Sequence, residues 1–145
     1  MKVLDASMTL AWIFPRHDPA EASLAEQALD ELDHEDFAVP AIWYGEVANA
    51  LLRGERKGLI THSQTAAFLA ELDLADIETE TDSPRLRQSV VMALARSYSL
   101  TAYDAMYLEL ALRRGAPLAT FDSQLADATR KAGGRVYGDA AVKHV

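Results

Sequence analysis

The sequence has no cysteine among its 145 residues, and none of its apolar runs is long. Without cysteine, the chain has no disulfide, no thiolate nucleophile and no cysteine-ligated zinc site. The apolar stretch Met8–Phe14 is far shorter than the roughly 20 residues that a membrane-spanning helix needs. The start of the chain also lacks the charged, apolar and small-residue order of a secretory signal. We therefore expect a cytoplasmic protein that does not cross a membrane.

Basic residues are in the minority. The chain has 14 Lys and Arg against 22 Asp and Glu, a formal net charge of −8, and a pI near 4.9. This balance argues against a protein that coats duplex DNA with a broad basic face. It does not exclude an enzyme that contacts nucleic acid through one local basic rim beside an acidic centre.

Half of the residues are hydrophobic, which is enough to build a core in a chain of this length. Short apolar runs alternate with longer segments of helical periodicity, and this alternation is typical of a parallel sheet covered by helices on both faces. We expect one domain over residues 1–145. The predicted strands are 2–5, 37–39, 76–78, 117–120 and 135–137, and the predicted helices are 6–14, 19–33, 42–57, 61–72, 84–97, 101–114 and 123–132.

Four carboxylates lie at the boundaries of these elements. Asp5 ends the first apolar run and Asp122 follows the run 117–121, while Glu46 and Asp104 lie near the starts of two helices. Open parallel sheets bind ligands at the carboxyl ends of their strands, where the strand order reverses. That edge would gather all four acids, and such a set of oxygen donors suits Mg²⁺ or Mn²⁺.

Helix capping explains three of the same acids without a metal. Asp5 and Asp122 each directly precede a helix, where aspartate is a preferred N-cap. Asp104 occupies the third helical position after Thr101, as in a capping box. Glu46 is not explained in this way. From the residues alone, both a metal centre and a set of structural caps therefore stay open.

Small polar residues accompany the acids. Ser7 lies two positions after Asp5, and Thr120 lies two positions before Asp122, so either hydroxyl could bond a carboxylate or belong to a local turn. Asn49 falls on the same helical face as Glu46, one turn further along.

The four acids belong to segments that together resemble a known family. The segments are Lys2-Val3-Leu4-Asp5-Ala6-Ser7, Trp43-Tyr44-Gly45-Glu46-Val47-Ala48-Asn49-Ala50-Leu51, Leu100-Thr101-Ala102-Tyr103-Asp104-Ala105 and Leu118-Ala119-Thr120-Phe121-Asp122. In this order and spacing they resemble PIN-domain nucleases and, more narrowly, the VapC toxins of VapBC toxin–antitoxin modules. The resemblance covers essentially the whole chain, and the ordered set is more specific than any single motif.

The resemblance implies an α/β/α sandwich with a short parallel sheet of four to five strands. It implies a Mg²⁺- or Mn²⁺-dependent endoribonuclease that forms a homodimer and is neutralised by a cognate VapB-like antitoxin. It places metal-binding, catalytic acids at Asp5, Glu46, Asp104 and Asp122, with supporting polar residues at Ser7, Asn49 and Thr120. The alternative is an inactive PIN-like binding module whose acids only cap helices.

The RNA substrate would need contacts outside the acids. Basic candidates for a local rim are Arg53, Arg56, Lys57, Arg113 and Arg114, and aromatic candidates for stacking on unpaired bases are Trp43, Tyr44 and Tyr103. Each also has an ordinary structural explanation, as a solvated helix end or as part of the core.

Overall fold

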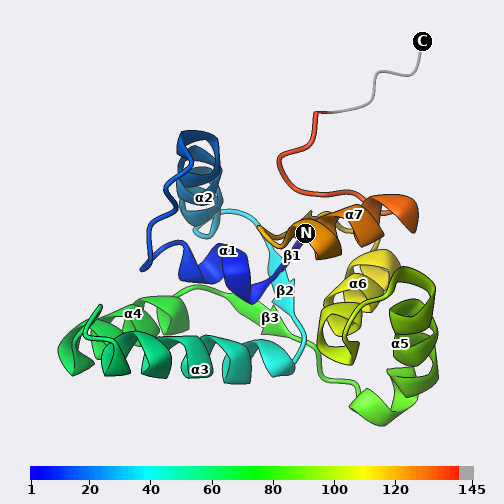
Figure 1. The fold of residues 1–145 in the computed structure, drawn as a ribbon, viewed down its shortest axis with the longest axis horizontal. Helices are drawn as coiled ribbons and strands as arrows, with labels where there is room; N and C mark the ends of the chain where they lie inside the picture. The colour runs from blue at the N-terminus through cyan, green and yellow to red at the C-terminus, as the bar shows by residue number, and fades with distance from the viewer. Residues whose placement is uncertain (141–145) are drawn as a thin grey trace.

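A four-stranded parallel sheet lies at the centre of residues 1–140, the part of the chain that the computed structural model describes (Figure 1). The elements in chain order are β1 Lys2–Leu4, α1 Ala6–Leu10, α2 Pro19–Glu31, β2 Phe37–Val39, α3 Ile42–Arg56, α4 His62–Leu74, β3 Ile77–Thr79, α5 Pro84–Tyr98, α6 Ala102–Arg114, β4 Leu118–Ala119 and α7 Ser123–Lys131. The alternation of short strands and helices that the sequence predicts is confirmed.

The strand order is β3-β2-β1-β4, so β1 is paired on both sides. In the parallel register Val3 lies beside Ala38 of β2 and beside Leu118 of β4. The chain winds outward from β1 to β3 and then crosses back to β4 on the far side of β1. The strand order therefore reverses between β1 and β4, which is where an open α/β sheet binds its ligands.

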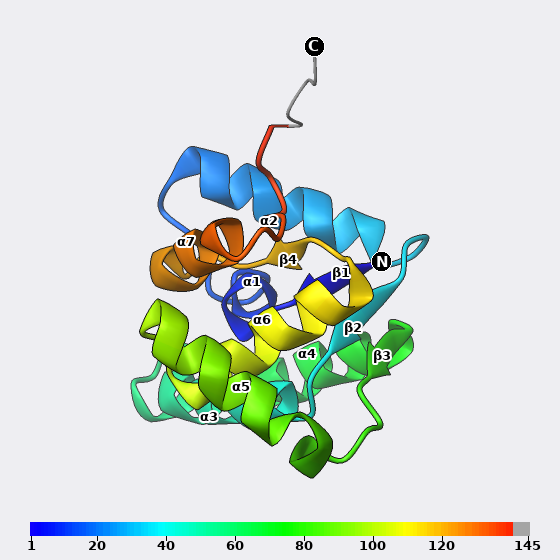
Figure 2. The ribbon, with the colours of Figure 1, turned by 90° about the vertical axis from the view of Figure 1, so that its right-hand side faces the viewer.

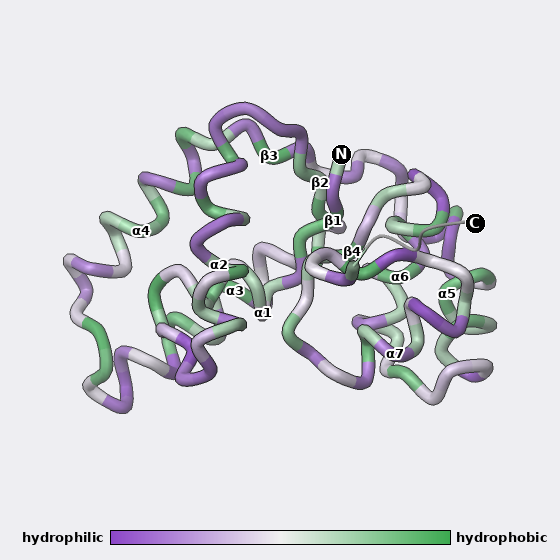
Figure 3. The backbone as a smooth tube through the Cα atoms, turned by 90° about the horizontal axis from the view of Figure 1, so that it is seen from above, coloured by the Kyte–Doolittle hydropathy of each residue, from purple (hydrophilic) through white to green (hydrophobic). Residues whose placement is uncertain are grey.

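Helices cover both faces of the sheet. Helices α1 to α4 form one layer and α5 to α7 form the other, as the view from above shows (Figure 3); in the side view α5 and α6 lie in front of the sheet (Figure 2). Hydrophobic residues line β1 and β2 between these layers (Figure 3). Val3, Leu4, Phe37, Val39 and Leu118 are all buried, as expected for short strands covered on both sides. The α/β/α sandwich is confirmed. In residues 1–140 no helix combines the length and apolar character needed to cross a membrane.

The strand predicted at 135–137 is wrong. Only Val136 forms a bridge, to Leu118, and the chain is tied to β4 by the hydrogen bonds from Leu118 N to Arg135 O and from Tyr137 N to Leu118 O, both 2.9 Å. Because β4 is itself only two residues long, it offers no ladder along which a fifth strand could extend. The sheet of residues 1–140 therefore has four strands.

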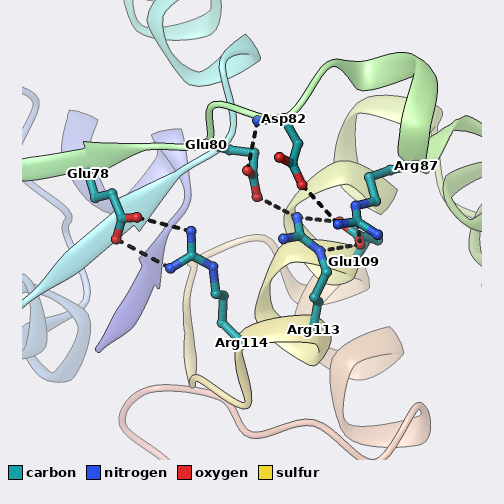
Figure 4. A network of polar contacts seen from close by, with 7 residues as sticks. All are labelled: Glu78, Glu80, Asp82, Arg87, Glu109, Arg113 and Arg114. Atoms are coloured by element: carbon teal, nitrogen blue, oxygen red, sulfur yellow. Dashed lines mark hydrogen bonds and ion pairs between the residues drawn. The ribbon is translucent and has the colours of Figure 1, made fainter.

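A network of charged side chains joins α6 to β3 and to the start of α5 (Figure 4). At its centre Arg113 donates from Nε to Oε1 of Glu109 at 2.7 Å and also donates to Glu80. Arg87 donates to Asp82 at 2.9 Å. The bond to Glu109 is the main reason that the pKa of Arg113 lies above its ordinary value. The network holds the β3–α5 connection against α6.

Breaking this network at Glu109 is expected to lower the stability of the folded protein. Glu109 is buried within it, so Glu109→Ala leaves Arg113 with fewer partners and is expected to cost about 2 kcal/mol of unfolding free energy. This is below the usual cost of breaking a buried pair, because the Arg113 side chain is 24% exposed. Urea denaturation would measure the loss. The control is Glu78→Ala, which breaks the exposed pair with Arg114 and should cost less than about 0.5 kcal/mol. Equal losses would contradict a special role for Glu109.

Candidate active site

The four predicted acids surround the carboxyl edge of β1 and β4. Asp5 directly follows β1, and Asp122 follows β4 at the start of α7. Glu46 projects from the second turn of α3 and Asp104 from the first turn of α6. Their charges act on one another: Asp5 with Asp122, Glu46 with Asp5 and Asp104, and Asp104 with Asp122 and Asp5. The acids therefore share one electrostatic environment at the switch point of the sheet.

Asp5 is the most deeply placed of the four, with only 6% of its surface exposed. Its side chain does not meet the geometry of an N-cap, although the backbone N–H of Ser7 in α1 lies near enough to favour ionised Asp5. Instead, its Oδ2 accepts from Ser7 Oγ at 2.6 Å and from Thr120 Oγ1 at 2.7 Å. The two hydroxyls that the sequence singles out thus both bond one oxygen of Asp5, Ser7 from α1 and Thr120 from the end of β4.

The same hydroxyls fix the loop after β4. Ser7 Oγ accepts from the backbone N–H of Phe121 at 2.8 Å, and Thr120 Oγ1 accepts from that of Asp122 at 3.0 Å. Each hydroxyl thereby uses its hydrogen on Asp5 and a lone pair on the loop. The β4–α7 loop that carries Asp122 is anchored through side chains to the β1–α1 corner.

The side chain of Asp122 caps its helix, whereas that of Asp104 does not. Asp122 is exposed and caps α7, accepting from Leu125 N at 2.9 Å, as the capping interpretation predicts. At the start of α6, Thr101 Oγ1 accepts from Asp104 N at 3.1 Å, while the return bond of a capping box is absent. Asp104 is therefore not held by a backbone cap, and Asp122 is.

Glu46 has a partner that the sequence reading missed. Tyr107 of α6 donates its hydroxyl to Glu46 Oε1 at 2.5 Å. Tyr107 lies three residues after Asp104, so both lie on one face of α6, and that spacing was the available signal. Asn49, predicted as a supporting residue, is exposed and makes no side-chain hydrogen bond within residues 1–140.

Burial and mutual repulsion raise the pKa of three acids. Burial is the main cause for Asp5; its hydroxyl partners oppose the rise, and the charge of Asp122 adds to it. Burial also raises the pKa of Glu46, with Tyr107 opposing and the charges of Asp5 and Asp104 adding. For Asp104, burial and then the charges of Asp122 and Asp5 raise the pKa. The site therefore resists carrying its full negative charge.

No lysine, arginine or histidine of residues 1–140 forms an ion pair with any of the four acids. A concentration of negative charge without a protein counter-ion suits a bound cation, and donors that are all carboxylate oxygens suit Mg²⁺ or Mn²⁺. As the side chains stand, however, no three acidic or histidine side chains in this part of the chain converge closely enough to hold one ion. The chemistry of the donor set fits a divalent cation, but a closed ligand cage is not formed.

The predicted RNA contacts divide into available and unavailable side chains. Trp43 is buried and donates to Thr9 Oγ1 at 3.0 Å, so it belongs to the core and cannot stack on a base. Tyr44 and Tyr103 are 49% and 57% exposed. Among the predicted basic residues, Arg53, Arg56 and Lys57 are exposed at the end of α3.

Arg113 and Arg114 are not free for a substrate. Arg113 is bound to Glu109 and Glu80, and Arg114 donates to both carboxylate oxygens of Glu78. The sequence offers these two arginines as candidates for a basic rim, with a solvated helix end as the ordinary alternative; the structure pairs both with acids. Their partners are Glu78 of β3, Glu80 directly after it and Glu109 of α6, and the pairing depends on a fold that the sequence pattern does not specify.

Comparisons with known proteins give the same family as the sequence segments. Residues 2–131 match the PIN domain. The chain is 32% identical over 127 residues to Ribonuclease VapC3 of Pyrobaculum aerophilum, covering 86% of this chain and 92% of that protein. The crystal structure of PAE2754 from Pyrobaculum aerophilum shares the fold, with a TM-score of 0.68 and 23% identity over 93% of this chain and 81% of that one. The chain belongs to the PIN-domain family and, within it, to the VapC proteins.

Proposed function

We propose that this protein is a divalent-metal-dependent endoribonuclease that acts as the toxin of a type II toxin–antitoxin pair. The observation that carries the proposal is the group of four mutually repelling acids without a protein counter-ion at the switch point of the sheet. Membership of the PIN-domain family and similarity to a protein named a ribonuclease support it.

In this proposal Asp5 and Asp104 hold a Mg²⁺ or Mn²⁺ ion directly, and Glu46 and Asp122 bind a second ion or orient the attacking water. A bound divalent ion supplies activation of water and stabilisation of charge on the phosphoryl oxygens. The chain itself contributes alignment. Because Ser7 and Thr120 both bond Oδ2 of Asp5, they fix the plane of that carboxylate. The raised pKa of Glu46 suits it to accept a proton from the attacking water through a carboxylate oxygen.

The substrate in this proposal is RNA with unpaired nucleotides. Tyr44 and Tyr103 are exposed and lie within two residues of Glu46 and Asp104 in sequence; the Tyr44 hydroxyl bonds Thr79 Oγ1 at 2.6 Å, which leaves its ring exposed. Exposed aromatic rings stack on splayed single-stranded bases. The exposed cations at the end of α3, Arg53, Arg56 and Lys57, would contact the RNA backbone.

The partners in this proposal are a second copy of the chain and a VapB-like antitoxin. Helices α3 and α4 and the turn between them leave large apolar side chains in contact with solvent: Leu52, Leu59, Leu69 and Leu74, the last of them 88% exposed. Such a surface is suited to a protein partner and is unusual for a protein that remains alone. The surface would serve either a second copy or an antitoxin helix.

Two observations favour the alternative of an inactive binding module. Asp122 caps α7, and no three acids of residues 1–140 converge on one point. That alternative does not account for Asp5, which is buried, bonds two hydroxyls in place of a regular N-cap, and pairs with no cation of residues 1–140. It predicts that divalent ions bind weakly and that the protein cleaves no RNA.

Cleavage of RNA by the purified wild-type protein tests the proposed function. We expect structured RNAs with single-stranded loops to be cut in Mg²⁺ or Mn²⁺ and to stay intact with a chelator. Mn²⁺ at about 100 times its dissociation constant should also raise the unfolding free energy by about 2.7 kcal/mol. Ca²⁺, a larger oxygen-binding ion, serves as a control for general charge screening. If neither cleavage nor Mn²⁺-dependent stabilisation occurs, the binding-module alternative is favoured instead.

A further inference from the structure

Tyr107 joins two of the elements that build the site. It lies on α6, one turn after Asp104, and none of its surface is exposed. Its hydroxyl reaches across to α3 and donates to Glu46 Oε1 at 2.5 Å, over a separation of 61 residues. A fully buried phenol is therefore in direct contact with a carboxylate of the site.

Tyr107 acts only as a donor in this contact. A carboxylate oxygen has no hydrogen to give, so the phenol supplies the hydrogen of this bond. A phenol carries a single hydrogen, and here that hydrogen is directed to Glu46. The bond therefore takes up Oε1 of Glu46.

Glu46 has no other restraint within residues 1–140. It forms no ion pair there, and its second oxygen, Oε2, makes no hydrogen bond. Asp5, in contrast, is held by two hydroxyls at one oxygen. A glutamate side chain has three rotatable bonds and loses much freedom when it is fixed. The phenol of Tyr107 is thus the contact that fixes the carboxylate of Glu46.

We infer that Tyr107 is a positioning residue that occupies Oε1 of Glu46 and thereby reserves Oε2 for a divalent ion or the attacking water. The inference rests on the proposed function. Groups that orient the ligands of metal sites in this way usually contribute about 10- to 100-fold to metal affinity or activity. Tyr107 would have no contact with RNA.

The variant Tyr107→Phe tests the inference because it removes one oxygen and keeps the ring in the core. Calorimetric titration should show Mn²⁺ binding weakened by about 10-fold or more, and kcat for RNA should fall by a similar factor. KM for RNA should stay within about twofold of wild type, since Tyr107 acts on the carboxylate and not on the substrate. Unchanged Mn²⁺ affinity and kcat would overturn the inference.

Tyr137→Phe is the matched control. Tyr137 is also buried and also donates to a glutamate, Glu31 Oε2 at 2.9 Å. Glu31 lies at the end of α2, and its partner cation is Lys2, so this pair belongs to a different cluster. The control should leave Mn²⁺ affinity and kcat unchanged. An equal loss of Mn²⁺ affinity and kcat in both variants would show that the loss comes from general destabilisation. That result would overturn the positioning role of Tyr107.

Two further variants separate positioning from packing. In a Glu46→Ala background Tyr107→Phe should weaken Mn²⁺ binding no further, because its effect passes through Glu46. An undiminished effect there would overturn the inference.

Glu46→Gln should bind Mn²⁺ as poorly as Glu46→Ala, since Tyr107 would bond the amide oxygen and leave the NH₂ group, which cannot ligate a cation. Retained affinity in Glu46→Gln would also overturn it.

The two proposals fail in different ways. A wild-type protein that neither binds Mn²⁺ nor cleaves RNA contradicts the proposed function and, with it, the role of Tyr107. A wild-type protein that does both, together with a Tyr107→Phe variant that behaves identically, contradicts only the positioning role.

Discussion

Asp5→Asn is expected to reduce metal-dependent RNA cleavage by about 1000-fold or more while leaving the metal-free protein at least as stable as wild type. Asp5 is the most buried acid of the site, and its loss removes a direct cation ligand. Stabilisation of charge by a bound cation is worth several kcal/mol, and each 1.36 kcal/mol corresponds to a factor of ten in rate. Single-turnover cleavage of a labelled RNA would measure the loss.

The stability half of this prediction follows from the surroundings of Asp5. Burial and the charge of Asp122 make ionised Asp5 unfavourable in the folded protein. Asparagine has nearly the same shape, and its amide oxygen can accept from Ser7 and Thr120 as Oδ2 does. The substitution therefore removes an uncompensated charge and keeps both hydrogen bonds. Removing the same charge from a group that acts only as a helix cap would bring no such gain.

The control for Asp5 is Asp127→Asn, which changes an acid of α7 that pairs with Arg130 at the surface. It should alter neither cleavage nor stability measurably, because exposed pairs contribute little. If the Asp5→Asn protein cleaves RNA like wild type, the metal-centre hypothesis is wrong. A large loss of stability in Asp5→Asn would instead indicate that Asp5 is a structural residue.

The sequence predicts the edge of the sheet at which the acids lie because that edge follows from element order alone. Short apolar runs that alternate with helices form a parallel sheet, and Asp5 and Asp122 follow two of those runs. The adjacency of β1 and β4 then brings Ser7 and Thr120 within hydrogen-bonding distance of one another, at 3.2 Å. These hydroxyls could be singled out beforehand because both are close in sequence to an acid.

Contacts between distant helices could not be predicted in the same way. The partner of Glu46 is 61 residues away, and nothing in the periodicity of α3 or α6 specifies that contact. Arg113 has the features of a free cation at a helix end, yet Glu80, directly after β3, and Glu109 of its own helix bind it. Asp5 has the sequence position of an N-cap, but its carboxylate is held mainly by the hydroxyls of Ser7 and Thr120, the second of them 115 residues away. Side-chain pairing in three dimensions, and not local preference, decides each case.

The absence of a counter-ion separates this acidic group from the other acidic group in the molecule. Glu78, Glu80, Asp82 and Glu109 are each paired with an arginine (Figure 4), and Arg113 serves two of them. The acids around Asp5 have no such cations within residues 1–140 and repel one another. A group of acids that repel one another lowers the stability of the folded protein. Such a loss of stability is common at sites that bind a ligand.

Mn²⁺ binding is expected to tighten by about tenfold for each unit of rising pH over the range in which the site acids lose their protons, as long as one proton leaves per ion bound. The pKa values of Asp5, Glu46 and Asp104 are raised, so this range begins at their ordinary values of 3.8 to 4.5 and extends upward. Calorimetric titration with Mn²⁺ at a series of pH values would measure it. RNA cleavage should rise with pH over the same range.

The metal-free protein should respond to pH in the opposite direction. Where the pKa of a carboxyl is raised by folding, the folded state binds more protons than the unfolded state, so stability falls as pH rises from the ordinary pKa to the raised one. The three site acids therefore make the metal-free protein less stable as pH rises through this range, and saturating Mn²⁺ should remove the loss. The pKa of Asp139 is lowered, mainly by its bond to Arg130, so its ionisation makes the folded protein more stable as pH rises, and it does so at lower pH.

The triple variant Asp5→Asn, Glu46→Gln and Asp104→Asn isolates the contribution of the site. Its stability should no longer fall as pH rises through that range, and Mn²⁺ should have no effect on it at any pH. Wild-type protein whose metal-free stability rises through the range would contradict the raised pKa values of the site acids. If the triple variant kept the wild-type fall, the effect would belong to other carboxyl groups, and the four acids would not be the charge that a divalent ion neutralises.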